Sequence, residues 1–462
     1  MTVITKLQQL GDGARALRIH RQLIAHDQWS PDQLTQFQRR QVTRLIRHAV
    51  QHSDFYRELY ADIRIDDGTD LQDLPVITKQ TMMRNFDRLV TDRRLRLANL
   101  ESHLNQIRED EYYLGQYRVL GTSGTTGLRG VFVYNRREWS TVLANALRWY
   151  SFLGIRPRFP RRIRITSIGA DNPLHVSARL VESGNIGLFA FQRLEVTSSL
   201  DRLVDDLNAF QPEVLLPYPS IAALLAEEQI AGRLRIHPRI ISTHTEAVTA
   251  PMLRKIQAAW SLTPFNHYGM TELPTFGSEC SLHRGIHAFE DLFIAEVVDD
   301  ANRAVPPGRA GEKLLLTNLY NFTQPLIRYE LSDILTVGQQ PCPCGRPFRL
   351  IVEMGGRSEE VIVLTDAEGR EVQVPPLLFS ATLDSFQEIA EFQITHRAGS
   401  VDIEAVPRQD AHRQELADSL VDRLGAAIKS LGAEPPPIHV TFVDQLRRKR
   451  SASGKTRLID KD

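Results

Sequence analysis

Gly121-Thr-Ser-Gly-Thr-Thr-Gly127 lies between two short apolar runs, 117–120 and 131–134, that are typical of β-strands. Its three glycines let the backbone turn tightly and approach a ligand closely. Four hydroxyl side chains beside several backbone N–H groups form a neutral cradle for an anion such as a polyphosphate. The segment is not the P-loop of nucleoside triphosphatases, because no lysine follows its last glycine. It predicts a phosphate-binding loop between two strands, and a flexible surface loop is the alternative.

The segments around this loop predict an α/β fold. Residues 32–60 place apolar side chains at three- and four-residue spacings, as a single amphipathic helix would, and residues 138–152 also indicate a helix. Between about 160 and 300, strand-like apolar runs alternate with helical stretches, which favours a partly parallel sheet. The expected strands are 163–168, 214–216 and 239–242, and the expected helices are 220–229 and 251–260.

The last third of the chain predicts a change of architecture. Residues 311–355 are rich in strand-like patterns, and Gly355-Gly-Arg-Ser-Glu-Glu360 interrupts them. A hairpin over 361–374 and two amphipathic helical stretches separated by strands are expected after it. We therefore expect an α/β protein with a large N-terminal domain of mixed sheets (residues 1–355) and a small α+β C-terminal domain (residues 356–462).

Composition excludes several classes of protein. Lys plus Arg and Asp plus Glu number 56 each among the 462 residues, whereas a chain whose main partner is nucleic acid usually has a basic excess. No run approaches the roughly 18 consecutive apolar residues of a membrane span. The first residues lack the apolar core of a signal peptide, and three cysteines cannot form a disulfide framework. These features predict a cytoplasmic protein with neither a nucleic-acid nor a membrane partner.

Five segments, in order, resemble motifs of the adenylate-forming superfamily of acyl-CoA synthetases, peptide-synthetase adenylation domains and luciferases. They are Gly121–Gly127, Tyr268-Gly-Met-Thr-Glu272, Arg328-Tyr-Glu-Leu-Ser-Asp333, Gly356-Arg-Ser-Glu-Glu360 and Ser453-Gly-Lys455. Three further segments are similar to the phenylacetate–CoA ligase branch of that superfamily: Leu74-Pro-Val-Ile-Thr-Lys79, Pro217-Tyr-Pro-Ser220 and Cys342-Pro-Cys-Gly-Arg346. The five motifs span most of the chain.

The resemblance implies that a carboxylate attacks the α-phosphate of Mg-ATP and that pyrophosphate leaves. Catalysis of this kind depends on positioning and on stabilising charge at the phosphate oxygens. By resemblance, Thr271 contacts the α-phosphate, Glu272 holds Mg²⁺, and Lys455, on a C-terminal domain that rotates after adenylation, neutralises charge in the transition state. The other residues implied in ATP binding are Thr122, Ser123, Gly124, Thr125, Thr126 and Gly127 at the β- and γ-phosphates, Tyr268 at adenine, Asp333 at the ribose, and Arg357 at the ribose or a phosphate.

These assignments have structural alternatives. A Thr-Glu pair often starts a helix, Tyr268 can be a packed core residue, Asp333 can form a turn, and Lys455 can belong to a solvated basic tail. The chain also departs from the superfamily at two places. Glu359 stands at the hinge position that normally holds Asp or Lys, and the phosphate loop continues as 127–130, Gly-Leu-Arg-Gly, instead of ending in Gly-x-Pro.

The three cysteines lie in two short segments that are similar to segments of the family. Cys280, Cys342 and Cys344 with one imidazole would complete the tetrahedral set of three thiolates and one nitrogen that binds structural Zn²⁺. His287 is the first choice for the fourth ligand and His283 the second. Three reduced thiols without a metal are the alternative.

The residues that would bind the acid are less clearly indicated by the sequence. By resemblance, Tyr218, His244 and Gly269 contact an aromatic acid, although Tyr218 and His244 can equally be core residues. The leading hypothesis is an acid–CoA ligase that forms acyl-AMP from a small carboxylic acid and transfers the acyl group to CoA. Transfer to an amine, hydroxyl or carrier-protein acceptor is an alternative, as is a non-catalytic nucleotide-binding protein of the same fold. The sequence is also compatible with a homodimer.

Overall fold

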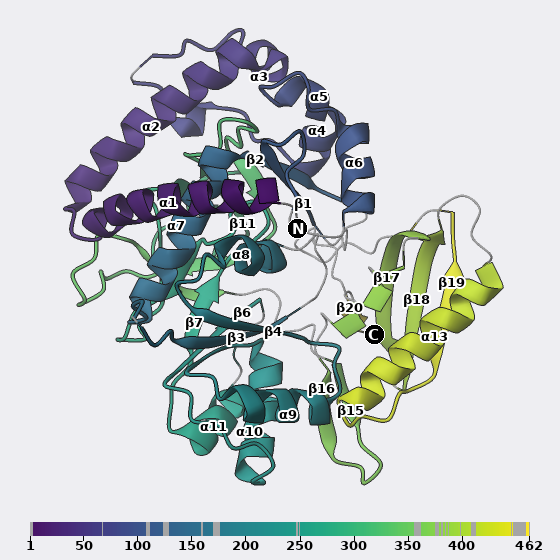
Figure 1. Cartoon of the computed structure of the whole chain (residues 1–462). Coiled ribbons are helices and arrows are strands. Elements are labelled where there is room, and N and C mark those ends of the chain that lie inside the picture. Colours follow the sequence, from purple (N-terminus) through teal and green to yellow (C-terminus); the bar gives the residue numbers. More distant parts are fainter. Residues whose placement is uncertain are drawn as a thin grey trace.

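The computed structural model describes residues 3–66, 68–107, 111–122, 129–158, 160–169, 176–245, 248, 250–354, 362–374, 378–379, 382–383, 385–386, 388–397, 399–407, 413–444, 446 and 459–461. Figure 1 shows helices packed around a long sheet, with the C-terminal strands and helix α13 (Arg413–Ser430) beside them. Within these ranges no helix is both long enough and apolar enough to cross a lipid bilayer.

The N-terminal part is helical, and one helix predicted from its periodicity is in fact two. The prediction of a single helix over 32–60 is wrong because the helix breaks at Ser53. The Ser53 N–H donates to the Ala49 carbonyl and so ends one helix, while its hydroxyl accepts the N–H of Tyr56 and starts the next. The elements are α1 (Val3–His26), α2 (Pro31–His52), α3 (Asp54–Leu59), a 3₁₀ turn (Leu71–Asp73), α4 (Lys79–Arg84), α5 (Phe86–Leu89) and α6 (Leu97–Gln106).

A nine-stranded sheet forms the middle of the molecule, with the order β13-β14-β9-β8-β7-β6-β5-β3-β4. The strands from β4 to β7 in this order are parallel and those from β7 to β13 are antiparallel, so the predicted mixed, partly parallel sheet is confirmed. Its strands are β3 (Arg164–Gly169), β4 (Ala190–Glu195), β5 (Val214–Leu216), β6 (Ile240–His244), β7 (Phe265–Tyr268), β8 (Gly277–Glu279), β9 (Ile286–Ala288), β13 (Leu335–Val337) and β14 (Leu350–Met354).

Helices cover both faces of the parallel strands, because successive side chains of a strand point to opposite faces. Val214 and Leu216 pack in one buried cluster with Trp149 and Tyr150 of α7. Leu215 belongs to another cluster, which includes side chains of α9, α10 and α11. Both faces are therefore buried, as expected of parallel strands. The helices are α7 (Arg136–Phe152), α8 (Val176–Gly184), α9 (Leu200–Phe210), α10 (Pro219–Ile230) and α11 (Ala250–Trp260).

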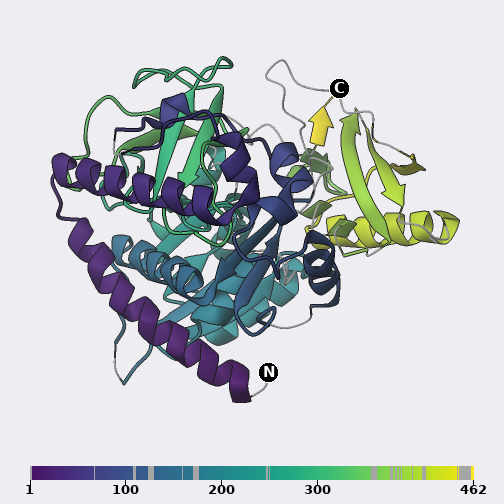
Figure 2. The ribbon, with the colours of Figure 1, turned by 90° about the horizontal axis from the view of Figure 1, so that it is seen from above.

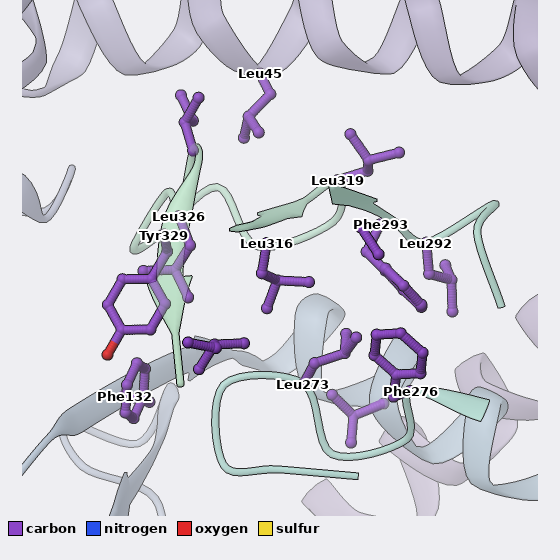
Figure 3. Packing of buried hydrophobic residues seen from close by; sticks show 14 of the residues in the cluster. Leu45, Phe132, Leu273, Phe276, Leu292, Phe293, Leu316, Leu319, Leu326 and Tyr329 are labelled. Atoms are coloured by element: carbon purple, nitrogen blue, oxygen red, sulfur yellow. The ribbon is translucent and has the colours of Figure 1, made fainter. Parts of the chain in front are cut away.

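Two smaller antiparallel sheets complete this part of the chain. Strands β1 (Tyr117–Gly121) and β2 (Val131–Asn135) form a hairpin, and β10 (Phe293–Val298), β11 (Lys313–Asn318) and β12 (Tyr329–Leu331) form a three-stranded sheet. Figure 3 shows Leu316 of β11 between Leu45 of α2 and Leu273 of the segment after β7. This core holds the hairpin, the three-stranded sheet and the N-terminal helices together.

A buried ion cluster fixes the end of α1 onto α7. The Arg148 guanidinium donates from Nε to Asp27 at 2.8 Å and from Nη1 to Asp291 at 2.7 Å. The Phe289 and Phe348 rings lie 4.9 and 4.7 Å from its central carbon. Because all three charged side chains are buried, removing Arg148 would leave two carboxylates without their shared cation in a medium of low dielectric constant.

The C-terminal part contains its own sheet. The predicted hairpin over 361–374 is present as β15 (Ile362–Thr365) and β16 (Glu371–Val374). A four-stranded sheet of order β19-β18-β17-β20 follows, and Figure 2 shows it with α13 to the side of the other elements. The remaining strands are β17 (Ile389–Arg397), β18 (Ser400–Pro407), β19 (Ile438–Phe442) and β20 (Ile459–Lys461). The predicted domain boundary at 355/356 lies outside the described residues.

Candidate active site

Thr122 closes the neck of the predicted phosphate loop. Its N–H donates to the Gly130 carbonyl at 2.9 Å, and the Gly130 N–H donates to its hydroxyl at 2.8 Å. These bonds continue the β1–β2 hairpin by one step and fix the two ends of the loop. The loop itself, residues 123–128, lies outside the described residues, and with it Ser123, Gly124, Thr125, Thr126 and Gly127.

Lys79, for which the sequence predicted no role, also lies at this neck. Its ammonium group donates to the Thr122 hydroxyl at 3.2 Å. A Cβ atom at Gly130 would lie 3.0 Å from the Lys79 Cε atom, so this glycine leaves room for the lysine side chain. The available signal was the segment 74–79, which carried the narrower family resemblance. Lys79 brings a positive charge to the loop that was predicted to bind polyphosphate.

A buried arginine positions the segment that carries Lys79. The Arg328 guanidinium donates to the Leu74 carbonyl at 2.6 Å and pairs with Glu296 at 3.1 Å. The backbone of Ile77 bonds to that of Arg328 at 3.1 Å. The segment is thereby attached to β12, and Asp333, half-buried, lies in the loop between β12 and β13. The Lys79 and Asp333 segments are thus fixed to the same strand.

The Tyr268–Glu272 motif forms the end of β7 and a tight turn after it. The Met270 N–H donates to the Leu273 carbonyl at 3.0 Å, and the Leu273 N–H donates back to the Met270 carbonyl at 3.2 Å. A Cβ atom at Gly269 would lie 2.2 Å from the Pro274 carbonyl oxygen, so only glycine fits there. The turn therefore depends on Gly269, which lies two residues before Thr271 and three before Glu272, the residues predicted to contact the α-phosphate and Mg²⁺.

Two buried tyrosines hold this turn against the phosphate-loop hairpin. The hydroxyl of Tyr134, on β2, donates to the carbonyls of Thr271 at 3.2 Å and Glu272 at 2.9 Å. The Tyr329 phenol is hydrogen-bonded to the Glu272 carboxylate, and burial raises its pKa well above the usual value. Figure 3 shows Tyr329 beside Phe132 of β2. The predicted motifs at 268–272 and 328–333 therefore meet at the β1–β2 hairpin, which flanks the predicted phosphate loop.

Histidines and aromatic rings gather at the carboxyl ends of β6 and β7. His244 and His267 are neighbours in the parallel register, and their rings lie 6.5 Å apart. Tyr218 makes an edge contact with His244 at 5.0 Å, and Trp149 stacks on His267 at 3.9 Å. Burial lowers the pKa of His244 to about 4 and that of His267 well below its usual value, so both imidazoles are neutral near pH 7.

The two histidines therefore form a neutral polar cluster with Tyr218, and it borders the Tyr268–Glu272 turn. The His267 Cε1 atom lies 3.3 Å from the position that a Cβ atom would take if Gly269 carried one. The predicted acyl-side residues Tyr218, His244 and Gly269 are thus brought together. His267 and Trp149 were not predicted to join them.

The four predicted zinc ligands lie within reach of a single ion. One ligand atom each from Cys280, His287, Cys342 and Cys344 can be chosen so that all lie within 4.8 Å of one another. The Sγ atoms of Cys280 and Cys342 are 3.7 Å apart, and Cys344 Sγ lies 3.6 Å from His287 Nε2. Tetrahedral zinc bonds of about 2.3 Å to sulfur and about 2.0 Å to nitrogen give edges of about 3.8 and about 3.5 Å. The observed spacings fit that geometry.

The protonation of these groups follows from their surroundings. Burial lowers the pKa of His287 to about 4, which keeps the imidazole neutral, as a metal ligand must be. Burial raises the pKa of Cys280 to about 11. Burial also tends to raise the pKa of Cys344, but hydrogen bonds from the Arg346 backbone and side chain lower it overall. His283 pairs with Glu279 at 3.1 Å and is not in the cluster.

Two further predicted residues, Arg357 and Lys455, lie outside the described residues, as does the hinge residue Glu359. The described site therefore comprises the neck of the phosphate loop, the Tyr268–Glu272 turn, Asp333, the histidine cluster and the cysteine cluster.

Comparison with known proteins supports the same assignment. The chain is 25% identical to the phenylacetate–coenzyme A ligase of Thermus thermophilus over 469 residues, covering 93% of this chain and 96% of that protein. It is 22% identical to the protein CapK of Staphylococcus aureus over 314 residues, covering 65% of this chain and 62% of that protein. No model of a protein family matches the chain.

Solved structures of 2-hydroxyisobutyryl-CoA ligase share the fold. The structure in complex with 2-HIB-AMP and CoA in the thioesterification state has a TM-score of 0.61 at 18% identity, covering 95% of this chain and 92% of that one. The postadenylation state with R3-HIB-AMP has a TM-score of 0.58 at 18% identity, covering 95% and 91%. The chain is therefore related in sequence to a phenylacetate–coenzyme A ligase over nearly its whole length and has the fold of an acid–CoA ligase, in agreement with the predicted resemblance to the adenylate-forming superfamily.

Proposed function

We propose that the chain adenylates a small carboxylic acid with ATP, releases pyrophosphate and passes the acyl group to CoA. The observation that supports this most directly is the attachment of the Thr271–Glu272 turn to β2 by the Tyr134 hydroxyl. β2 leaves the predicted phosphate loop, so a polyphosphate in that loop and a metal at Glu272 would lie on connected, rigid elements. The names of the relatives, ligases of phenylacetate and of 2-hydroxyisobutyrate, support a CoA acceptor.

The triphosphate would bind at the neck that Thr122 and Gly130 close. Ser123, Gly124, Thr125, Thr126 and Gly127 are proposed to donate backbone and hydroxyl hydrogens to the β- and γ-phosphates. The Lys79 ammonium, 3.2 Å from the Thr122 hydroxyl, adds a positive charge at the neck of this loop. A pre-positioned cation of this kind stabilises charge that develops on the leaving pyrophosphate.

The remaining nucleotide contacts are assigned by motif. Tyr268 is proposed to stack on adenine, and Asp333 to accept hydrogen bonds from the ribose hydroxyls, with Arg357 at the ribose or a phosphate. Thr271 is proposed to contact the α-phosphate. Lys455, on a C-terminal domain of residues 356–462 that rotates against residues 1–355, is proposed to neutralise charge between acid and phosphate.

Mg²⁺ fits the chemistry of Glu272. This buried carboxylate provides the oxygen ligand that the ion prefers, beside the turn proposed to contact the α-phosphate. When bound, the ion would neutralise phosphate charge and orient the triphosphate. The Tyr329 phenol, through its hydrogen bond, holds the carboxylate in one orientation.

We also propose that Cys280, His287, Cys342 and Cys344 hold a structural Zn²⁺. Four protein ligands close the coordination shell, so the ion would supply stability and no chemistry. The ligands come from the end of β8, from β9 and from the loop that leads into β14. The ion would therefore cross-link three segments of the antiparallel part of the large sheet. A matched pair of variants tests this site: His287→Ala should lose the zinc, whereas His283→Ala should keep it.

The zinc content of the purified protein is measured by elemental analysis. About one equivalent is expected for wild type and for His283→Ala. A metal-free wild-type protein, or a His287→Ala variant that keeps its zinc, would contradict the assignment.

On the acyl side, Tyr218, His244 and Gly269 are proposed to contact the acid, and an aromatic acid fits the rings gathered there. The assay is acid-dependent ATP–pyrophosphate exchange without CoA, over a panel of aryl, arylacetic and aliphatic acids. Exchange with at least one acid, followed by thioester formation when CoA is added, is the expected result. Exchange without a CoA thioester would redirect the search to an amine, hydroxyl or carrier-protein acceptor. No exchange with any acid would overturn the proposed function.

A further inference from the structure

His267 carries a polar atom that its surroundings leave unsatisfied. The side chain is 7% exposed, and its Nε2 atom is buried without a hydrogen-bond partner in the described part of the chain. The same holds for Nε1 of Trp149, whose ring stacks on the imidazole at 3.9 Å. Leaving a buried polar atom unpaired costs roughly 1–3 kcal/mol. Two in one stacked pair indicate a group that supplies their partners.

The position of the imidazole indicates where that group binds. The Cε1 atom, which is bonded to Nε2, lies 3.3 Å from the position that a Cβ atom would take if Gly269 carried one. His267 and Tyr268 are successive residues of β7, so their side chains point to opposite faces of the sheet. His267 is the register partner of His244, which contacts Tyr218. The unsatisfied atom thus belongs to the face of His244, whose ring contacts Tyr218, and not to the face of Tyr268.

The ligand on this face is the acid if the proposed function is right, and the present inference rests on that function. We propose that His267 determines specificity by hydrogen-bonding a hydroxyl or amino substituent of the acid, so that the preferred substrates are polar-substituted carboxylic acids. A neutral imidazole offers one donor and one acceptor and can serve either substituent. Trp149, a donor only, adds a partner for a substituent oxygen. An unsubstituted apolar acid would leave both atoms unpaired.

The energetic consequence is a difference between matched acids. A site built to hydrogen-bond a substituent discriminates strongly against the analogue that lacks it, because its own buried groups are then unpaired. Wild type should therefore use the hydroxy- or amino-substituted member of at least one matched pair at least about tenfold better in kcat/KM. Suitable pairs are benzoate with its hydroxy and amino derivatives, phenylacetate with hydroxyphenylacetate, and isobutyrate with 2-hydroxyisobutyrate.

The test is ATP–pyrophosphate exchange with these pairs for wild type, His267→Phe, His267→Gln and the control His237→Phe. His237 is exposed, lies in the loop before β6 and is not one of the site residues. His267→Phe keeps an aromatic ring for Trp149 but removes both nitrogens. It should lose the preference for the polar acid, with the KM for ATP unchanged, while His267→Gln should keep part of it and His237→Phe all of it. Thermal unfolding of each variant identifies any that fail to fold.

The outcomes separate the two proposals. Exchange that favours the polar acid in wild type and loses this preference in His267→Phe supports the role of His267. Exchange that favours the unsubstituted acid in every pair, or a preference that survives in folded His267→Phe, overturns that role but leaves adenylation intact. Absence of exchange with every acid overturns the proposed function and this inference with it.

Discussion

Gly269→Ala tests how strictly the Tyr268–Glu272 turn is built. The added Cβ would lie 2.2 Å from the Pro274 carbonyl oxygen and 3.0 Å from its carbonyl carbon. Ordinary contact begins at about 3.4 Å, so the backbone must move by roughly 1 Å, and the obstacle is backbone that cannot rotate away. Thr271 and Glu272, two and three residues later, would be displaced with it.

The expected effect is larger on rate than on stability. Overpacking of this kind costs about 1–3 kcal/mol of folding free energy, whereas misplacing groups by about 1 Å can lower a rate about 100-fold. We therefore expect kcat for acid-dependent ATP–pyrophosphate exchange to fall about 100-fold, equivalent to about 2.7 kcal/mol in activation free energy. Urea unfolding followed in parallel should show that the variant is folded.

The matched control is Gly425→Ala in α13. Its Cβ would approach only the Pro435 side chain, at 4.0 Å, so the same substitution makes no close contact. It should leave exchange unchanged and, within a helix, slightly raise stability. Exchange at the wild-type rate in Gly269→Ala would refute the argument that the geometry of this turn positions the reacting groups.

Three further predictions follow from described contacts. Lys79→Met should raise the KM for ATP about tenfold and leave the KM for the acid unchanged, because one charge-assisted contact to phosphate is lost. The control is Lys255→Met, which breaks a surface ion pair with Glu227; equal KM values for ATP in both variants would argue against the role of Lys79. Arg148→Met should lower the free energy of unfolding in urea by about 3–5 kcal/mol, because Asp27 and Asp291 lose their buried partner. The exposed Arg57→Met is the control and should leave the urea midpoint unchanged; an unchanged midpoint in Arg148→Met as well would contradict the prediction. The free energy of unfolding should fall by up to about 3 kcal/mol on acidification from pH 6.5 towards about 4, because His244 has a pKa of about 4 in the folded protein and is protonated first in the unfolded chain. His244→Asn should show a shallower pH dependence of the unfolding midpoint, and an unchanged slope would be evidence against a buried neutral imidazole.

The parts of the fold that local pattern controls were predictable. Short apolar runs between helical stretches correctly indicated β3, β5 and β6, and the phosphate-loop flanks formed the β1–β2 hairpin. The break at Ser53 was missed because the apolar periodicity continues through it. A serine hydroxyl that caps the next helix changes the backbone path without changing that pattern.

The site was predictable where a motif carried it and not where tertiary structure assembled it. The cysteines were recognised by residue type, and His287 joined them because β8, β9 and β14 are adjacent in the sheet. Lys79 reaches Thr122 across 43 residues through the buried Arg328, and no local pattern signals such a contact. Likewise, only the packing of α7 on the sheet brings Trp149 onto His267.

The most direct test of adenylation follows the carboxylate oxygen. Wild-type protein is incubated with ATP, CoA and the ¹⁸O-carboxylate-labelled acid that gives the fastest exchange, and the products are analysed by mass spectrometry. Attack of the carboxylate on the α-phosphate predicts one ¹⁸O atom in AMP and none in pyrophosphate, because thiolysis of acyl-AMP leaves the bridging oxygen on the phosphate. Label in inorganic phosphate, with ADP as the other product, would show that the acid attacks the γ-phosphate and would contradict the central claim.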